Sequence, residues 1–92
     1  MYLVYILLSE RTGRYYVGHT NDLDRRIAEH NRIKGKYTDT GIPWKVAYTE
    51  VFNSKTEAYA RERYIKSRKS VDFVRQLILG SEDSPDIDLP AR

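Results

Sequence analysis

The sequence predicts an α+β fold in which helices flank a three-stranded, mainly antiparallel sheet, in the order strand, strand, helix, strand, helix, helix. Three observations support this prediction. Residues 2–8 form an apolar run of strand length, residues 22–33 carry apolar side chains at helical spacing, and Ser54-Lys55-Thr56-Glu57 has the pattern of a helix start. We expect residues 1–80 to form one domain. Residues 81–92 hold two prolines and four acidic residues without apolar periodicity, which predicts a mobile acidic tail.

The three predicted strands differ in their patterns. Residues 2–8 are apolar on both alternating sets of side chains, as expected for a central strand that is covered on both faces. Residues 9–14 have turn composition, so a second strand over 15–19 would form a hairpin with the first. A third strand is predicted over 44–52 from its β-branched and aromatic residues. Residues 34–43, rich in Gly, Thr and Lys, are predicted to form a loop.

The first helix is predicted over residues 22–33, with Thr20 or Asn21 as its cap. Arg26 borders the inward face of this helix, whereas the neighbouring Arg25 faces solvent. Arg26 could bind a phosphate, or it could lie at the core edge or pair with a carboxylate. The inward face itself consists of three residues at positions i, i+4 and i+7: Leu23, Ile27 and His30.

Two further helices are predicted after the third strand. The Ser-x-x-Glu pattern that begins at Ser54 is typical of a capping box, and the helix that it opens should run to about Lys69. Ser70 is expected to cap a third helix over residues 71–79, which Gly80 would end in a left-handed conformation.

A carboxylate interrupts the inward face of the second helix. Ala58, Glu62 and Ile65 fall at positions i, i+4 and i+7. An inward carboxylate needs a cation, a hydrogen-bond donor or a metal, because burying it unpaired costs several kcal/mol. It could therefore form an internal ion pair, with Arg26 as a candidate partner. Alternatively, a single carboxylate suits Mg²⁺ or Mn²⁺, which keep most of their waters and take further ligands from a phosphate.

Composition favours some functions and excludes others. Residues 1–80 have a net charge of +6 and residues 81–92 one of −3. A basic body can supply the salt-sensitive part of nucleic-acid binding, although a solvated cationic surface explains the charge equally well. The chain has no cysteine, which excludes disulfides and thiolate metal sites and suits a reducing cytoplasm. The apolar run at residues 2–8 is too short to span a membrane.

Tyr5 and Tyr16 lie eleven residues apart on the two predicted hairpin strands. A hairpin and the following helix could bring two phenols and the Arg26 guanidinium to one point, which would suit a phosphodiester. Each tyrosine alone is more typical of packing, and only the spacing of the two distinguishes them. Gly18 indicates close approach of a substrate or another backbone, or a bulge. His30 could be a base or a phosphate donor, or simply a hydrogen-bonded histidine.

Other site signatures are absent from the sequence: it has no paired His/Cys metal cluster, no glycine-rich phosphate loop and no Gly-x-Ser-x-Gly elbow. The order and spacing of the flagged residues resemble the GIY-YIG nuclease superfamily, especially its small single-domain bacterial members, over residues 2–79. Leu3-Val4-Tyr5 stands for the first motif and Tyr16-Val17-Gly18 for the second. Leu3 replaces the glycine of the first motif, and the predicted third helix has no asparagine where many relatives have one. The resemblance implies five catalytic residues: Tyr5, Tyr16, Arg26, His30 and Glu62.

This resemblance implies an endonuclease that hydrolyses DNA with one divalent cation, Mg²⁺ or Mn²⁺, held by Glu62. The ion would shield the scissile phosphate and stabilise the departing oxygen. Arg26 would neutralise charge on the phosphate oxygens, and Tyr5, helped by Tyr16 or His30, would accept a proton from the attacking water. A free tyrosine has a pKa of about 10, so Tyr5 would need nearby cations to act as a base near neutrality.

The resemblance also implies a DNA-binding surface around these groups. Its expected substrate-binding residues are Gly18, His19, Lys36 and Tyr37, the last two from the loop over residues 35–38. We expect low sequence specificity, or specificity supplied by a protein partner, in DNA repair or processing. The alternatives are a non-catalytic nucleic-acid-binding module and a small interaction protein in which Glu62 and Arg26 form an internal ion pair. The nuclease hypothesis requires the catalytic groups to share one water-accessible hollow.

Overall fold

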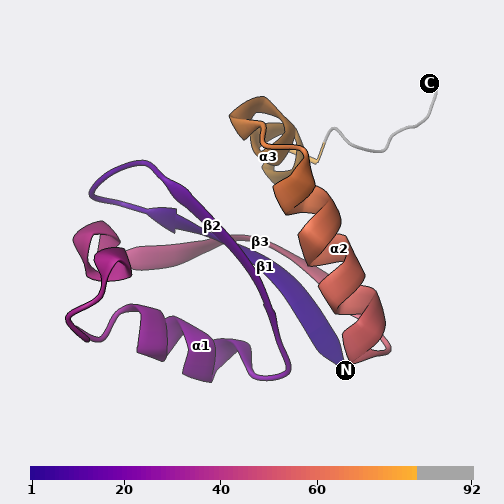
Figure 1. Cartoon of the computed structure of the whole chain (residues 1–92), viewed down its shortest axis with the longest axis horizontal. Coiled ribbons are helices and arrows are strands. Elements are labelled where there is room, and N and C mark those ends of the chain that lie inside the picture. The colour runs from indigo at the N-terminus through magenta and orange to yellow at the C-terminus, as the bar shows by residue number, and fades with distance from the viewer. Residues whose placement is uncertain (81–92) are drawn as a thin grey trace.

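The computed structural model describes residues 1–80; the tail predicted over residues 81–92 lies outside the described residues. The predicted α+β fold is confirmed (Figure 1). The sheet has the strand order β2-β1-β3, and both pairs are antiparallel. The elements are β1 (Tyr2–Ser9), β2 (Tyr15–Thr20), α1 (Leu23–His30), the 3₁₀ helix η1 (Tyr37–Gly41), β3 (Trp44–Phe52), α2 (Lys55–Ser67) and α3 (Val71–Ile78).

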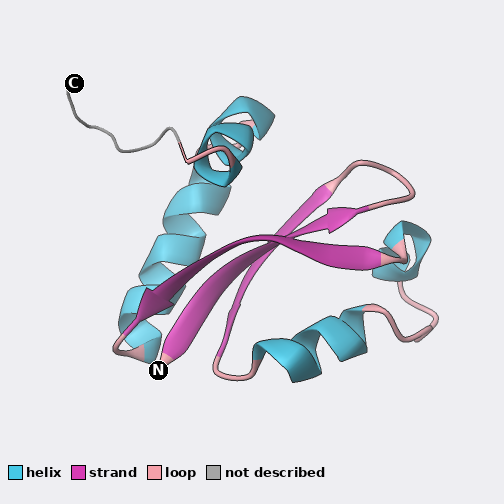
Figure 2. Ribbon diagram, turned by 180° about the vertical axis from the view of Figure 1, so that it is seen from behind, coloured by secondary structure: helices cyan, strands magenta, loops and turns pink. Residues whose placement is uncertain are grey.

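The central strand β1 is covered on both faces, as its two apolar sets predict. Val4 and Ile6 pack against a core formed by α2 and α3. Tyr5 and Leu7, on the opposite face, pack with Trp44 against α1. Figures 1 and 2 show α1 on one side of the sheet and the α2–α3 pair on the other. Side chains from the two faces can therefore meet only around an edge of the sheet, and β2 is the edge strand nearest to the flagged residues.

Helix α1 is shorter than predicted, because a long-range contact ends it. It stops at His30, where the Asn31 amide accepts a hydrogen bond from the Trp44 N–H (2.6 Å) and donates one to the Trp44 carbonyl (2.9 Å). The predicted caps were wrong, since Asp22 accepts the bond from the Arg25 N–H at the start of the helix. The Thr20 hydroxyl instead accepts a hydrogen bond from the Asp22 N–H (3.0 Å) and extends β2 by one residue.

The predicted loop over residues 34–43 contains the 3₁₀ helix η1. The Asp39 carboxylate organises it by accepting hydrogen bonds from the backbone N–H groups of Lys34, Gly35 and Lys36 (2.6–3.1 Å). These bonds hold the pKa of Asp39 below its usual value, outweighing the effect of burial, which would raise it. The Lys34 ammonium also donates a hydrogen bond to the Glu29 carbonyl (2.6 Å), which joins the segment to the end of α1.

The second and third helices follow their predicted starts. The Ser54 hydroxyl accepts from the Glu57 N–H and the Ser70 hydroxyl from the Phe73 N–H. Helix α2 ends at Ser67, two residues before the predicted end, and α3 ends one residue early at Ile78. The predicted inward face of α2 is confirmed, because three of its residues are buried: Ala58, Glu62 and Ile65.

Candidate active site

Tyr5 lies at the centre of the sheet and is fully buried. Its hydroxyl lies 3.3 Å from Nε2 of His30, and Nη2 of Arg26 donates a hydrogen bond to it over 3.4 Å. Both partners come from α1, because its i, i+4 spacing puts Arg26 and His30 on one side of the helix above the sheet. The arginine predicted to border the core is thus in contact with the hairpin tyrosine.

Gly18 lies opposite Tyr5 in the β1–β2 register. A Cβ atom at position 18 would lie only 2.5 Å from the Tyr5 hydroxyl oxygen and 2.6 Å from Cζ. The β1–β2 pairing is regular there, so the bulge considered for Gly18 is absent. The glycine is needed because the Tyr5 ring extends across β2, and no other residue leaves room for it.

A hollow of about 320 Å³ lies beside this trio. The Tyr16 ring borders it, with its centroid 4.5 Å from that of His30 and 6.4 Å from that of Tyr5. Tyr5 itself lies beneath Arg26 and His30 and does not line the hollow. Eight residues line it, of which four are cations and one is an acid: Tyr16, Arg26, Glu29, His30, Arg32, Lys34, Lys36 and Thr38.

Glu62 reaches the edge strand from the other side of the sheet. One carboxylate oxygen lies 2.5 Å from Nδ1 of His19, and the other accepts a hydrogen bond from the Lys66 ammonium (2.6 Å). Arg26 pairs instead with Glu29 (3.2 Å), so the ion pair considered between Glu62 and Arg26 is absent. The inward carboxylate expected from the sequence has two other partners.

The two groups of side chains are neighbours around β2 but do not share one hollow. The Lys66 ammonium lies 5.9 Å from the centre of the Tyr16 ring, which bridges the two sides. Glu62 lines a separate hollow of about 370 Å³ together with Tyr59 and Arg63. The expectation of a single water-accessible hollow was wrong. The edge strand separates the two faces of the sheet, and Tyr5 is covered by Arg26 and His30.

Electrostatics set the protonation states of these groups. Burial raises the pKa of Tyr5, and the Arg26 hydrogen bond offsets only part of that rise. Burial, with the nearby charges of Arg26 and Lys34, lowers the pKa of His30. Both side chains are therefore neutral at pH 7. The sequence predicted that nearby cations would lower the pKa of Tyr5 enough to form a phenolate, but Arg26 does not lower it that far.

Glu62 behaves in the opposite way. Burial would raise the pKa of this carboxyl, but the hydrogen bonds and charges of Lys66 and His19 lower it more. The carboxylate is therefore ionised at neutral pH, as a metal ligand must be. Across residues 1–80 no three His, Cys, Asp or Glu side chains form a metal-binding group, so a metal here would take few protein ligands. That donor set fits Mg²⁺ or Mn²⁺, which keep most of their waters.

The remaining predicted residues lie at varied distances from this centre. Lys36 lines the hollow of Arg26 and His30, and His19 contacts Glu62. Tyr37 is 70% exposed, bonds to Arg14 and lines a different cavity, so it lies outside the hollow where it was expected. Sequence reasoning missed Lys66, although its position four residues after Glu62 on a helix was a usable signal.

A family model described as the GIY-YIG catalytic domain matches residues 1–72. The chain belongs to the GIY-YIG family. The matched residues run from β1 to the start of α3 and include the whole candidate site. Membership places the chain in a nuclease superfamily, whose members generally depend on a divalent cation. Among residues 1–80 the helices are too short and polar to cross a bilayer.

Relatives of the GIY-YIG chain include small proteins named UPF0213, a name that states no activity. One from Streptococcus pneumoniae serotype 4 is 45% identical over 64 residues, covering 68% of this chain and 65% of that protein. One from Halobacterium salinarum is 46% identical over 67 residues, covering 72% and 86%. The chain thus spans just under two thirds of the pneumococcal relative's length.

A solved structure supports the fold assignment. The solution NMR structure of a UPF0213 protein from Bacillus halodurans is 38% identical to this GIY-YIG chain and superposes with a TM-score of 0.55. The similarity covers 88% of this chain and 86% of that one.

Proposed function

We propose that this protein is a metal-dependent endonuclease that hydrolyses phosphodiester bonds of DNA. The observation that carries the proposal is the Arg26–Tyr5–His30 hydrogen-bonded trio. An ionised Glu62, bonded to His19 of β2, lies on the other face of the sheet. A guanidinium, a phenol, an imidazole and a carboxylate supply a phosphate clamp, a proton path and a metal ligand. Family membership supports a nuclease; the substrate, metal and residue roles are our proposal. Because the catalytic groups lie in two hollows rather than one, the proposal requires a DNA strand that passes around β2 and contacts both groups.

Arg26 has two tasks in this account. Its side chain is 35% exposed and lines the hollow, so a phosphate can reach it, and the guanidinium would neutralise charge on the phosphate oxygens. Its bond to Tyr5 is long at 3.4 Å and would be replaced by shorter bonds to an anion. Substrate binding would then uncover the Tyr5 hydroxyl, which is otherwise inaccessible.

The proton of the attacking water would pass through Tyr5 to His30. Because Tyr5 is neutral, it cannot accept a proton without losing its own, and the His30 Nε2 atom is 3.3 Å away. Neutral His30 with its proton on Nδ1 would offer the Nε2 lone pair for that proton. In a concerted step the Tyr5 oxygen takes the water proton and delivers the phenol proton to His30. Tyr16, packed on the His30 ring, would hold that ring in position.

Glu62 would hold the divalent cation, Mg²⁺ or Mn²⁺. When bound, the ion would supply charge shielding at the scissile phosphate and stabilisation of the departing oxygen. Lys66 or His19 would have to release one carboxylate oxygen to make room, since both oxygens are occupied. Lys36 is accessible in the hollow for the phosphates beyond the scissile one. Gly18 would act indirectly, because its missing side chain makes room for the Tyr5 ring.

The test is plasmid nicking with Mg²⁺ or Mn²⁺, comparing the parent with Tyr5→Phe and Glu62→Gln. The proposal predicts metal-dependent nicking by the parent and loss of it in both folded variants. Binding of Mn²⁺, measured by electron paramagnetic resonance, should weaken in Glu62→Gln and stay unchanged in Tyr5→Phe. Equal nicking by the parent and Glu62→Gln would refute the assigned role of Glu62.

A non-catalytic nucleic-acid-binding module is the second candidate. The occupied carboxylate of Glu62 and the covered hydroxyl of Tyr5 favour it. Absence of nicking with every divalent metal, combined with steeply salt-dependent DNA binding, would establish it. The main proposal has three further parts. The nuclease has low sequence specificity or takes its specificity from a protein partner, it acts in DNA repair or processing, and it is located in the cytoplasm.

A further inference from the structure

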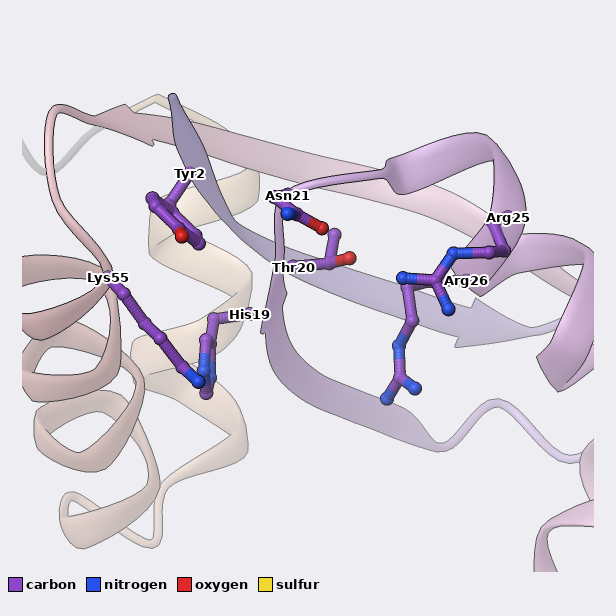
Figure 3. Close-up of a pocket in the computed structure, with 7 residues that line it drawn as sticks. All are labelled: Tyr2, His19, Thr20, Asn21, Arg25, Arg26 and Lys55. Atoms are coloured by element: carbon purple, nitrogen blue, oxygen red, sulfur yellow. The ribbon is translucent and has the colours of Figure 1, made fainter.

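A second cavity, of about 240 Å³, lies beside the candidate active site (Figure 3). It shares Arg26 with the hollow of His30, and its His19 is the residue bonded to Glu62. Figure 3 shows Arg25 and Arg26 on one side, Lys55 and His19 on the other, and Asn21 between them. The cavity is smaller than the roughly 300 Å³ typical of small-molecule pockets, so it suits one segment of a chain better than a whole cofactor.

The lining of this cavity is strongly cationic. Three of its seven residues are Arg25, Arg26 and Lys55, and it contains no acidic residue. Lys55 is exposed, and within residues 1–80 its ammonium has neither a hydrogen bond nor an ion pair. A cation without a partner at a cavity wall is available for an incoming anion at no cost in broken contacts.

The two arginines share one of their carboxylate partners. Arg25 lies 3.6 Å from Asp22 and 3.3 Å from Glu29, and the same Glu29 also pairs with Arg26. One carboxylate therefore serves two guanidinium groups. Among residues 1–80 the buried Nε atom of Arg26 has no hydrogen-bond partner.

We propose that this cavity binds the phosphate next to the scissile one on the same DNA strand, with Lys55 and Arg25 as its cations. The inference rests on the proposed nuclease function, because the strand has to pass from the hollow of Arg26 into this cavity. The Asn21 amide adds a neutral donor. Tyr2 and His19 offer flat faces for the sugar or base that this phosphate carries.

Arg25→Ala/Lys55→Ala tests the proposal against a matched control, Arg75→Ala/Lys45→Ala. The control removes the same charge from two exposed cations elsewhere: Arg75 pairs with an i−3 aspartate, as Arg25 does, and Lys45 lies 3.6 Å from Glu10. Binding of a fluorescent single-stranded oligonucleotide is measured in EDTA over a range of salt concentrations. We expect the slope of log K against log salt to fall by about one in the test variant and by less than half of that in the control.

An equal fall in both variants would overturn the inference. Because the assay contains no metal, it is independent of cleavage. A parent that never nicks DNA would refute the proposed nuclease function, whereas the salt slopes would still test phosphate binding in this cavity. If the parent cleaves DNA, a second substrate tests whether the cavity binds the phosphate next to the scissile one. This oligonucleotide carries a neutral methylphosphonate in place of that neighbouring phosphate. The parent should lose about tenfold in kcat/KM and the test variant no more than twofold, whereas equal losses would refute that position.

Discussion

The hydroxyl of Tyr5 occupies the space that a side chain at position 18 would fill. An added Cβ would lie 2.5 Å from that oxygen, closer than folded proteins allow. The two residues face each other in the β1–β2 register, so the glycine of one motif and the tyrosine of the other form a single steric unit. The same Tyr5 hydroxyl is the atom that Arg26 and His30 contact, so the steric unit lies at the centre of the candidate site.

Gly18→Ala should destabilise the fold by about 1–3 kcal/mol, because the added methyl group overpacks the Tyr5 ring. Urea unfolding measures the loss. In a Tyr5→Leu background the same substitution should cost less than half as much, since the clashing atoms are gone. Equal costs in both backgrounds would contradict the steric coupling.

Tyr5→Phe should reduce nicking by at least about 100-fold, because it removes the oxygen that accepts the water proton. The loss of stability should be only about 1 kcal/mol, since the ring remains and one weak hydrogen-bonded atom is lost. Single-turnover cleavage and urea unfolding give the two numbers. A variant that unfolds fully, or one that cleaves normally, would refute the assigned role.

Arg26→Ala should abolish cleavage while the fold is retained, because its side chain is one third exposed and its ion pair with Glu29 is an ordinary surface pair. Arg75→Ala, which breaks an exposed pair on α3, is the control and should change neither property. Melting temperature and nicking rate are compared for both variants. A large loss of melting temperature in Arg26→Ala would make the residue structural.

His30 should give the pH–rate profile an acid limb. Burial lowers the pKa of His30 below 6.5, so the ring is neutral above that pH and able to accept a proton. The rate should fall as pH drops through the lowered pKa, and His30→Gln should be slower and lack this limb. Measurements of kcat/KM from pH 5 to 8 test it. A limb that persists in His30→Gln would assign it to another group.

Glu62 should contribute to stability in a pH-dependent way. Its pKa is lower in the folded protein than the ordinary value of 4.5, so the carboxylate stabilises the fold above that pH. The contribution is lost as pH falls through the folded pKa. Glu62→Gln should therefore be less stable than the parent at pH 7, with the difference shrinking below pH 4.5. A constant difference in unfolding free energy over that range would contradict the expectation.

The sequence was sufficient for the elements whose signals are local. The apolar run of β1, the serine caps of α2 and α3, and the inward position of Glu62 all follow from patterns of a few residues. The end of α1 does not, because Asn31 ends the helix by bonding to Trp44, thirteen residues further along the chain. Loop geometry was equally hidden, since the Asp39 carboxylate organises three backbone groups of its own segment.

The candidate site could be predicted only in part, for the same reason. Helical spacing distinguished Arg26 from Arg25, whereas the partners of Glu62 depend on how α2 meets the edge strand. The burial of Tyr5 beneath Arg26 and His30 also needs the packed structure. Spacing in the chain thus identified which side chains gather at β2, but not which of them are exposed.

Strand cleavage itself tests the central claim most directly. Purified parent and Glu62→Gln, shown by circular dichroism to be equally folded, are incubated with an end-labelled DNA oligonucleotide in Mn²⁺, Mg²⁺ or EDTA. We predict shortened products from the parent with metal, none in EDTA and none from Glu62→Gln under any condition. Intact DNA with the parent in both metals, or cleavage that survives the loss of Glu62, would contradict the account.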